Sequence, residues 1–268
     1  MNNDKNKREN RKALRSFIPI LLLMAVIGGI IGAFSTTGTA AFWTGSARVI
    51  LREIMYVISP IGVIVMTLAG AVITLIYYRK GKKYYKESLS AGDEETEDLL
   101  LANADTNIAK ALMYISVCEI LSLIFFAAVA SYISDYIEKD SKIYMIALIV
   151  FIAGNFLRIK MQQMTVDFQK IMNPEKQGSV YDLRFQKKWE ESCDELEKFT
   201  IYRSAYKAYN TGTKVCVIMF TSLLLLSFFF DYGPLPAAAV GVVWLVNTVT
   251  YCREAIRLEK EKIKEESK

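Results

Sequence analysis

Glu119 is the residue of this sequence whose position points most directly to chemistry. It is the single charged residue within an otherwise uncharged, apolar run from Ala111 to Ser134. Ionisable residues in apolar helices are costly to bury and usually face a partner or a polar path. Glu119 is therefore a candidate proton or cation site.

Two amides in later apolar runs, Asn155 and Asn247, are the candidate partners of this carboxylate. In the alternative role, a protonated Glu119 forms a structural hydrogen bond to one of them. No lysine or arginine lies inside an apolar run to neutralise the charge. We therefore favour the structural role over ion handling.

The residues that most enzymes need are missing from this chain. It contains no histidine, and its four cysteines form no CxxC pair. Phosphate-loop, dinucleotide-binding, metal-ligand and nucleophile-elbow patterns are also absent. We therefore expect no enzyme activity, no metal site and no cofactor, and an intramembrane enzyme is the least favoured alternative.

The elements that must position Glu119 are long apolar segments. The chain has 268 residues, of which 53% are hydrophobic, and many of these are concentrated in six uncharged or nearly uncharged runs. A helix needs about 20 apolar residues to span a bilayer. The runs are 17–34, 54–78, 111–134, 143–157, 215–230 and 232–252. The predicted fold class is all-α: a polytopic six-helix transmembrane bundle of three helical hairpins with cytoplasmic helical extensions. We favour a retained first span over a cleaved signal peptide, because its apolar stretch exceeds a typical signal core.

Basic residues set the predicted orientation. All but four of the 33 lysines and arginines fall on one side of the six runs, and the exceptions are Arg48, Arg52, Lys139 and Lys142. The positive-inside rule places both termini in the cytoplasm. The outer connections are then short, the first running from Ser35 to Glu53.

This orientation divides the chain into alternating membrane and cytoplasmic parts. The predicted parts are a basic cytoplasmic N-terminus (1–16), the first transmembrane hairpin (17–78), a cytoplasmic loop (79–110), the second hairpin (111–157), a cytoplasmic helical loop (158–214), the third hairpin (215–252) and a charged cytoplasmic tail (253–268).

Small residues at helical spacing mark candidate packing faces. Gly28 and Gly32 form a GxxxG pair in the first run, and Ala237 and Gly241 form a similar pair in the last. We interpret both as helix-packing surfaces rather than as a dedicated dimer interface. Pro60 predicts a kink in the second run, with Ser59 as the candidate donor to a freed carbonyl.

An aromatic stripe is predicted on one amphipathic helix that begins near Phe185. Its members recur at three- and four-residue spacing and are Phe185, Trp189, Leu196, Phe199, Tyr202, Tyr206 and Tyr209. The stripe either packs on the protein's own 158–172 helix, which we slightly favour, or binds a partner or the membrane interface. The basic cluster from Arg79 to Lys86 is expected to touch anionic lipid rather than nucleic acid.

Part of the second cytoplasmic loop is similar to a known family. The stretch NPEKQGSVYDLRFQKKW (173–189), followed by SCDE (192–195) and IYRSAYKAY (201–209), resembles an uncharacterised bacterial multi-pass membrane protein family, domain of unknown function 3169. The resemblance implies a membrane architecture and a bacterial plasma-membrane location. It implies no activity, substrate or catalytic residue.

These observations favour an interaction or accessory protein of the plasma membrane, of immunity, stress-response or transporter-accessory type. The expected contacts are the lipid bilayer, a protein partner at the cytoplasmic face and a second copy of the chain, with no nucleic acid. A small transporter or channel that uses Glu119 is the alternative.

Overall fold

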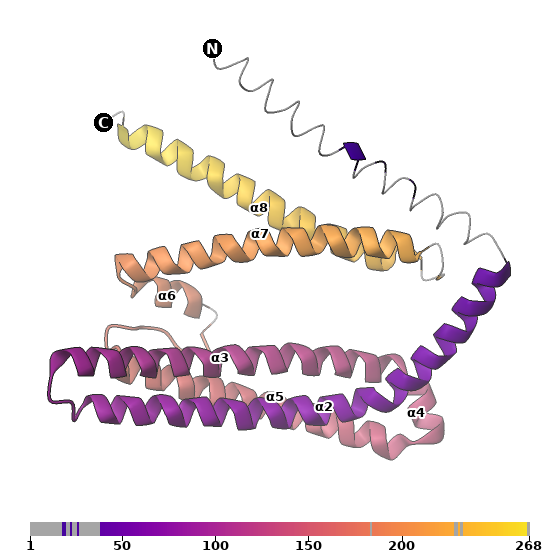
Figure 1. Cartoon of the computed structure of the whole chain (residues 1–268), viewed down its shortest axis with the longest axis horizontal. Coiled ribbons are helices and arrows are strands. Elements are labelled where there is room, and N and C mark those ends of the chain that lie inside the picture. The colour runs from indigo at the N-terminus through magenta and orange to yellow at the C-terminus, as the bar shows by residue number, and fades with distance from the viewer. Residues whose placement is uncertain are drawn as a thin grey trace, which may run out of the picture. The chain divides into compact units, whose positions relative to one another are not determined.

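All regular structure in the described part of the chain is helical. The computed structural model describes residues 18, 19, 22, 26, 38–182, 184–227, 230 and 233–266, with side chains between 38 and 48 described only at Gly45 and none beyond 260. Its helices are α2 (Gly38–Ser88), α3 (Glu94–Ser131), α4 (Ile133–Lys139), α5 (Ser141–Met172), α6 (Phe185–Glu191), α7 (Glu195–Leu226) and α8 (Leu235–Glu266) (Figure 1). The predicted all-α class is confirmed for these residues.

Five of these helices are long and apolar enough to cross a membrane. They are α2 from Val49 onward, α3, α5, α7 and α8 as far as Lys260. These five helices suggest a membrane protein. The first predicted span, 17–34, lies almost entirely outside the described residues, so the six-helix bundle of three hairpins stays a prediction.

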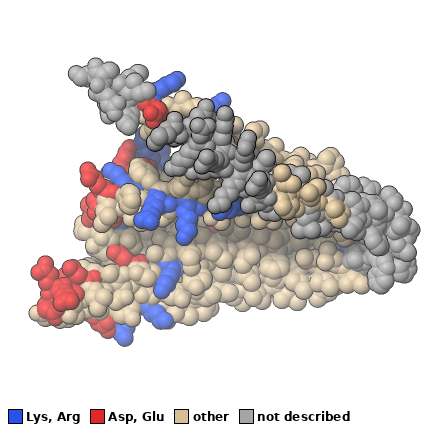
Figure 2. Space-filling view, turned by 45° about the horizontal axis from the view of Figure 1, so that its top comes forward, with Lys and Arg blue, Asp and Glu red and all other residues tan. Residues whose placement is uncertain are grey.

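The helices extend well beyond the apolar runs. Helix α2 begins at Gly38, so most of the connection expected from Ser35 to Glu53 is helical instead. The loop expected at 79–110 is also mostly helical, because α2 continues to Ser88 and α3 begins at Glu94. Figure 2 shows the consequence for the bundle that contains α2, α3 and α5: acidic and basic side chains gather toward one end of these helices, and uncharged surface covers much of their remaining length.

The chain separates into two compact units, of which the second comprises residues 50–199. In this unit α2, α3 and α5 run side by side (Figure 1). A buried cluster of Val63, Val129, Tyr136 and Ala147 forms its core. The rings of Phe126 and Phe151 stack beside it with centroids 3.9 Å apart. The three helices therefore form a packed bundle rather than a loose set of spans.

Three glycines set the antiparallel register of α2 and α3. A Cβ built on Gly62 would lie 2.5 Å from the Phe125 ring, and one on Gly70 would lie 2.9 Å from Cβ of Cys118. A Cβ on Gly81 would lie 2.9 Å from the Ile108 side chain. Only glycine fits these close approaches, so they fix which residues of the two helices face each other.

Pro60 interrupts the hydrogen-bond ladder of α2 without ending the helix. Proline lacks the N–H that would bind the carbonyl of Tyr56 four residues earlier. The Tyr136 hydroxyl from α4 donates to that carbonyl instead. Ser59, the donor expected from the sequence, donates its hydroxyl to the Met55 carbonyl.

The first unit includes residues 200–268, with most of α7 and all of α8. The Tyr209 ring of α7 stacks on the Tyr251 ring of α8 at 4.5 Å, and Phe220 meets Trp244 edge-on at 6.5 Å. These contacts make α7 and α8 an antiparallel pair. The expected charged tail is not a separate element, because α8 continues without a break to Glu266.

Candidate functional site

A set of polar side chains comes from all three helices of the bundle in the second unit. We call it the polar layer, and its members are Thr67 and Thr74 of α2, Glu119 and Ser122 of α3, and Asn155 and Arg158 of α5. The glycines bring these helices together, since a Cβ on Gly154 of α5 would lie 2.6 Å from Cγ2 of Thr67. Sequence reasoning found two members of the layer, Glu119 and Asn155.

Arg158 is the charged member of the layer that sequence reasoning missed. It is 3% exposed. Its Nη2 donates to Oδ1 of Asn155 at 2.9 Å. The carboxylate of Glu119 on α3 lies close enough to act electrostatically on the guanidinium. Arg158 ends the fourth apolar run in sequence, but it is buried in the bundle within electrostatic range of Glu119. A basic residue therefore lies nearer to Glu119 than the sequence indicated, although the two side chains form no ion pair.

Five polar atoms of the layer have no hydrogen-bond partner among the described residues. They are Oγ1 of Thr67, Oγ1 of Thr74, Oγ of Ser122, and Nε and Nη1 of Arg158. Hydroxyls in apolar helices usually donate to the carbonyl four residues earlier, as Thr165 does to Met161 at 2.8 Å. The hydroxyls of Thr67, Thr74 and Ser122 do not form this hydrogen bond to the preceding turn.

The two candidate amides have different surroundings. Asn155 donates its Nδ2 to the Phe151 carbonyl at 2.9 Å and accepts from Arg158. Asn155 therefore bonds to Arg158, on which Glu119 also acts electrostatically. Asn247 lies on α8 of the other unit and lines a surface cavity together with Tyr206 and Tyr251. Within the second unit, the structure joins Asn155 to Arg158 of the polar layer.

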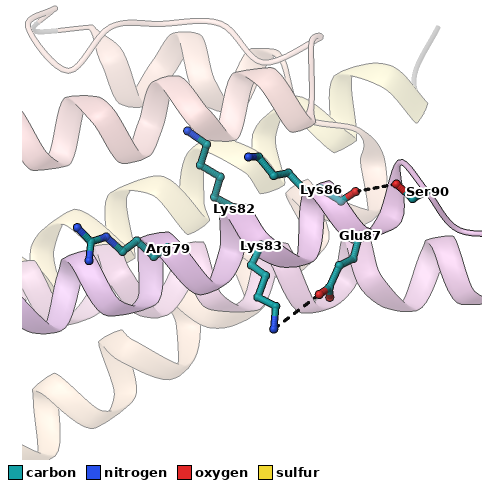
Figure 3. Close-up of a pocket in the computed structure, with 6 residues that line it drawn as sticks. All are labelled: Arg79, Lys82, Lys83, Lys86, Glu87 and Ser90. Carbon is teal, nitrogen blue, oxygen red and sulfur yellow. Dashed lines mark hydrogen bonds and ion pairs between the residues drawn. The ribbon is translucent and has the colours of Figure 1, made fainter.

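A basic groove follows α2 beyond its apolar run. We use this name for a cavity of about 520 Å³ lined by Arg79, Lys82, Lys83, Lys86, Glu87 and Ser90. Figure 3 shows that Lys82 and Lys86 extend to one side, whereas Lys83 turns toward Glu87. The Lys83 ammonium and the Glu87 carboxylate are 3.7 Å apart. The spacing of three and four residues keeps the four cations on neighbouring positions of the helix surface.

The aromatic stripe is divided between two helices, so the prediction of one helix across it is wrong. Helix α6 ends at Glu191, and α7 begins at Glu195. Asp194 begins the new helix, because its Oδ1 accepts from the Glu197 N–H at 2.7 Å while Glu197 Oε2 accepts from the Asp194 N–H at 3.0 Å. This reciprocal pair of hydrogen bonds is a capping box, which marks the start of a new helix. Helices α6 and α7 are therefore separate.

The two parts of the stripe have different contacts. Phe185 and Trp189 lie near each other on α6, with ring centroids 5.5 Å apart. On α7, Tyr206 and Tyr209 both contact Tyr251 of α8. Leu196, Phe199 and Tyr202 of α7 are more than half exposed. Tyr206 and Tyr209 of the α7 part thus pack against α8, and packing of the stripe on the 158–172 segment stays a prediction.

The predicted packing residues are placed only in part. Gly28 and Gly32 lie outside the described residues. Ala237 is buried, and a Cβ on Gly241 would lie 3.5 Å from the Phe220 ring of α7. The small residues of α8 therefore face the α7–α8 contact.

The loop from Asn173 to Arg184 contains the first part of the sequence that resembles the family. Lys176 is 5% exposed and forms an ion pair with Glu197 of α7. Its Nζ also lies 3.6 Å from Sγ of Cys193. Burial alone would lower the pKa of Lys176, but the hydrogen bond and charge of Glu197 raise it above its ordinary value. These motif residues therefore hold the loop against the start of α7.

No group of three or more histidine, cysteine, aspartate or glutamate side chains in the described part of the chain is arranged to hold a metal ion. The polar layer and the basic groove are two places in the described part of the chain where charged groups gather. One is buried within the bundle, and the other is open at its charged end.

Comparison with known proteins gives one match. A family model described as a protein of unknown function, DUF3169, matches residues 10–255. No curated protein and no solved structure matches the chain.

Proposed function

The chain belongs to the DUF3169 family of unknown function, and on that premise we propose that it is an interaction or accessory protein of a bacterial plasma membrane. The proposed orientation places both termini and the charged helix ends in the cytoplasm. Immunity, stress response and support of a transporter are the proposed roles. The observation that carries the proposal is the basic groove.

The groove presents more positive charge than its own unit neutralises. Arg79, Lys82 and Lys86 make no ion pair with any described residue, and Glu87 is the single acid in the lining. A surface with one sign of charge attracts groups of the opposite sign and orients them on approach. An acidic segment of a protein partner would complement this groove.

Two exposed leucines lie near the groove residues in sequence. Leu89, which precedes the lining residue Ser90, is 69% exposed, and Leu99 near the start of α3 is 64% exposed. Both lie beyond the apolar runs, at the charged ends of their helices. Buried apolar anchors beside complementary charges are typical of protein interfaces. The proposed partner therefore binds through an acidic segment with apolar neighbours.

The test is purification of the native chain in mild detergent with quantitative mass spectrometry of the copurifying proteins. We expect a stoichiometric partner that is lost from the Lys82→Gln/Lys86→Gln double variant. The matched control is Lys207→Gln/Lys214→Gln on α7, which removes the same charge from exposed positions elsewhere and should retain the partner.

Two results would contradict the proposal. Equal retention of the partner by both double variants would exclude the groove as its binding site. Alternatively, the chain could copurify with no protein while anionic vesicles bind it more tightly than they bind the groove variant. The groove would then be a lipid-headgroup site, and the interaction role would fail.

A second candidate function is favoured by Arg158. A small transporter or channel that uses Glu119 needs charged groups inside the bundle, and Arg158 lies buried opposite this carboxylate. Proton or cation flux in proteoliposomes should fall in Glu119→Gln and persist in the Glu138→Gln control. Equal flux in the two variants would remove this candidate. We propose no enzyme activity, since the chain has no histidine to act as a general base.

A further inference from the structure

The unpartnered atoms of the polar layer are all able to donate hydrogen bonds. Two guanidinium nitrogens of Arg158 and the hydroxyls of Thr67, Thr74 and Ser122 lack partners among the described residues. Buried polar groups are almost always hydrogen-bonded, and each exception requires an explanation. The layer contains one carboxylate, that of Glu119, but none of these five atoms bonds to it. The donors of the layer therefore call for a further acceptor.

The positive charge of Arg158 indicates that the missing acceptor carries a negative charge. Arg158 is 3% exposed and places a full positive charge between three helices. Among the groups that act on it, Glu119 and Cys118 lie on α3, and α2 has no charged residue between Glu53 and Arg79. A buried cation is stable only when it is paired and its hydrogen bonds are satisfied. Two of its three nitrogens are not satisfied by Glu119 or by any other described residue.

We infer that the polar layer binds a small inorganic monoanion such as chloride. A single atom of negative charge accepts N–H and O–H bonds from several directions, which suits donors that come from different helices. Hydrogen bonds to a charged partner are also stronger than those to water. The anion would bind beside the free guanidinium nitrogens, with the hydroxyls of Thr67 on α2 and Ser122 on α3 completing its coordination. Thr74 lies two helical turns beyond Thr67 and is too far along α2 to share the same ion.

This inference goes beyond the proposed interaction role and is independent of the basic groove. It also names a ligand class for the bundle interior that differs from the protons or cations of the transporter candidate. Anion binding requires Arg158 and the hydroxyls, whereas partner binding requires Lys82 and Lys86. The two proposals can therefore fail separately.

The test measures thermal unfolding of the full chain in mild detergent as chloride replaces gluconate at constant ionic strength. A ligand that binds only the folded state raises the unfolding midpoint along a saturating curve. We expect this rise in the wild-type chain and its loss in Arg158→Gln. In Ser122→Ala and Thr67→Val, we expect an apparent affinity for chloride that is weaker by about tenfold.

Two control variants separate a bound anion from a general effect of salt. Lys160→Gln removes an exposed charge two residues beyond Arg158, and Ser59→Ala removes a hydroxyl that already donates to Met55. Both should respond to chloride as the wild type does. If the wild type shows no preference for chloride over gluconate, or if all variants respond alike, the inference is wrong. The hydroxyl variants keep the test decisive if Arg158→Gln fails to fold.

Discussion

Tyr136 of α4 stacks on Tyr56 of α2 with ring centroids 4.3 Å apart, and its hydroxyl donates to the backbone carbonyl of the same residue. That carbonyl is free because residue 60 is proline. Burial raises the pKa of Tyr136 to about 12, so the hydroxyl remains protonated and able to donate at neutral pH. The Tyr136 side chain thus satisfies the carbonyl that Pro60 leaves without a donor, and its ring packs against α2 at the same place.

Tyr136→Phe should destabilise the chain by about 1–3 kcal/mol, because it keeps the ring contact but leaves a buried carbonyl unpaired. The measurement is thermal or denaturant unfolding in mild detergent. Pro60→Ala supplies the missing N–H, so the same tyrosine substitution should cost less in that background. An equal cost in both backgrounds would show that the hydrogen bond to the freed carbonyl is unimportant.

Gly154→Ala should lower the unfolding midpoint. Its new Cβ would lie 2.6 Å from Cγ2 of Thr67, and forcing α5 away from α2 is expected to cost about 1–3 kcal/mol. Gly212→Ala on α7 is the matched control, since a Cβ there meets nothing within 4 Å. That change should stabilise the chain by up to about 1 kcal/mol through helix propensity. Equal effects would argue against a close contact at Gly154.

Lys176→Gln should destabilise the loop that precedes α6, by about 1–3 kcal/mol. The estimate is below that for a fully buried ion pair because the Glu197 side chain is 40% exposed. Unfolding of the single and double variants with Glu197→Gln measures the coupling of the two side chains. An additive double variant would show that the ion pair contributes nothing.

The Lys176 contribution should also depend on pH. Its pKa is higher in the folded chain than the ordinary 10.5, so the stabilisation is complete below 10.5 and is lost as pH rises through the folded value. The difference in stability between wild type and Lys176→Gln should therefore shrink in strong alkali and remain constant near neutrality. A difference that grows as pH rises would contradict the ion pair.

Asp93→Ala should loosen the first turn of α3. Oδ1 of Asp93 accepts from the Thr96 N–H at 2.8 Å, and this bond holds the pKa of Asp93 below its ordinary 3.8. The stabilisation is therefore complete above 3.8 and is lost as pH falls through the folded value. Hydrogen exchange at Thr96 should accelerate in Asp93→Ala but not in Asp93→Asn, which can still cap the helix. Equal exchange in both variants would exclude the cap.

The sequence predicted five of the described helices through their apolar runs, but their ends were harder to place. Nothing in the composition of 79–88 separates a charged loop from a charged helix, so the extension of α2 to Ser88 was missed. The break before α7 did carry a signal. Asp194 and Glu197 have the spacing of a capping box, and the regular aromatic spacing across them suggested continuity instead.

Glu119 and Asn155 were predictable as site residues, whereas Arg158 was not. A count along the chain places Arg158 at the end of an apolar run, where a long basic side chain normally reaches the membrane surface. Its depth depends on how α5 packs against α3, which brings Phe151 level with Phe126 and Arg158 level with Glu119. That register is a property of the packed helices and cannot be read from either segment alone.

The glycine contacts between α2 and α3 also limit how this pair can move. Gly62, Gly70 and Gly81 each face a particular side chain of α3. A piston displacement of one helical turn, about 5.4 Å, would set Ile58 or Met66 against Phe125 in place of glycine. The two helices therefore cannot slide past each other along their axes. A conformational change transmitted along this pair requires α2 and α3 to tilt or rotate together as a rigid body.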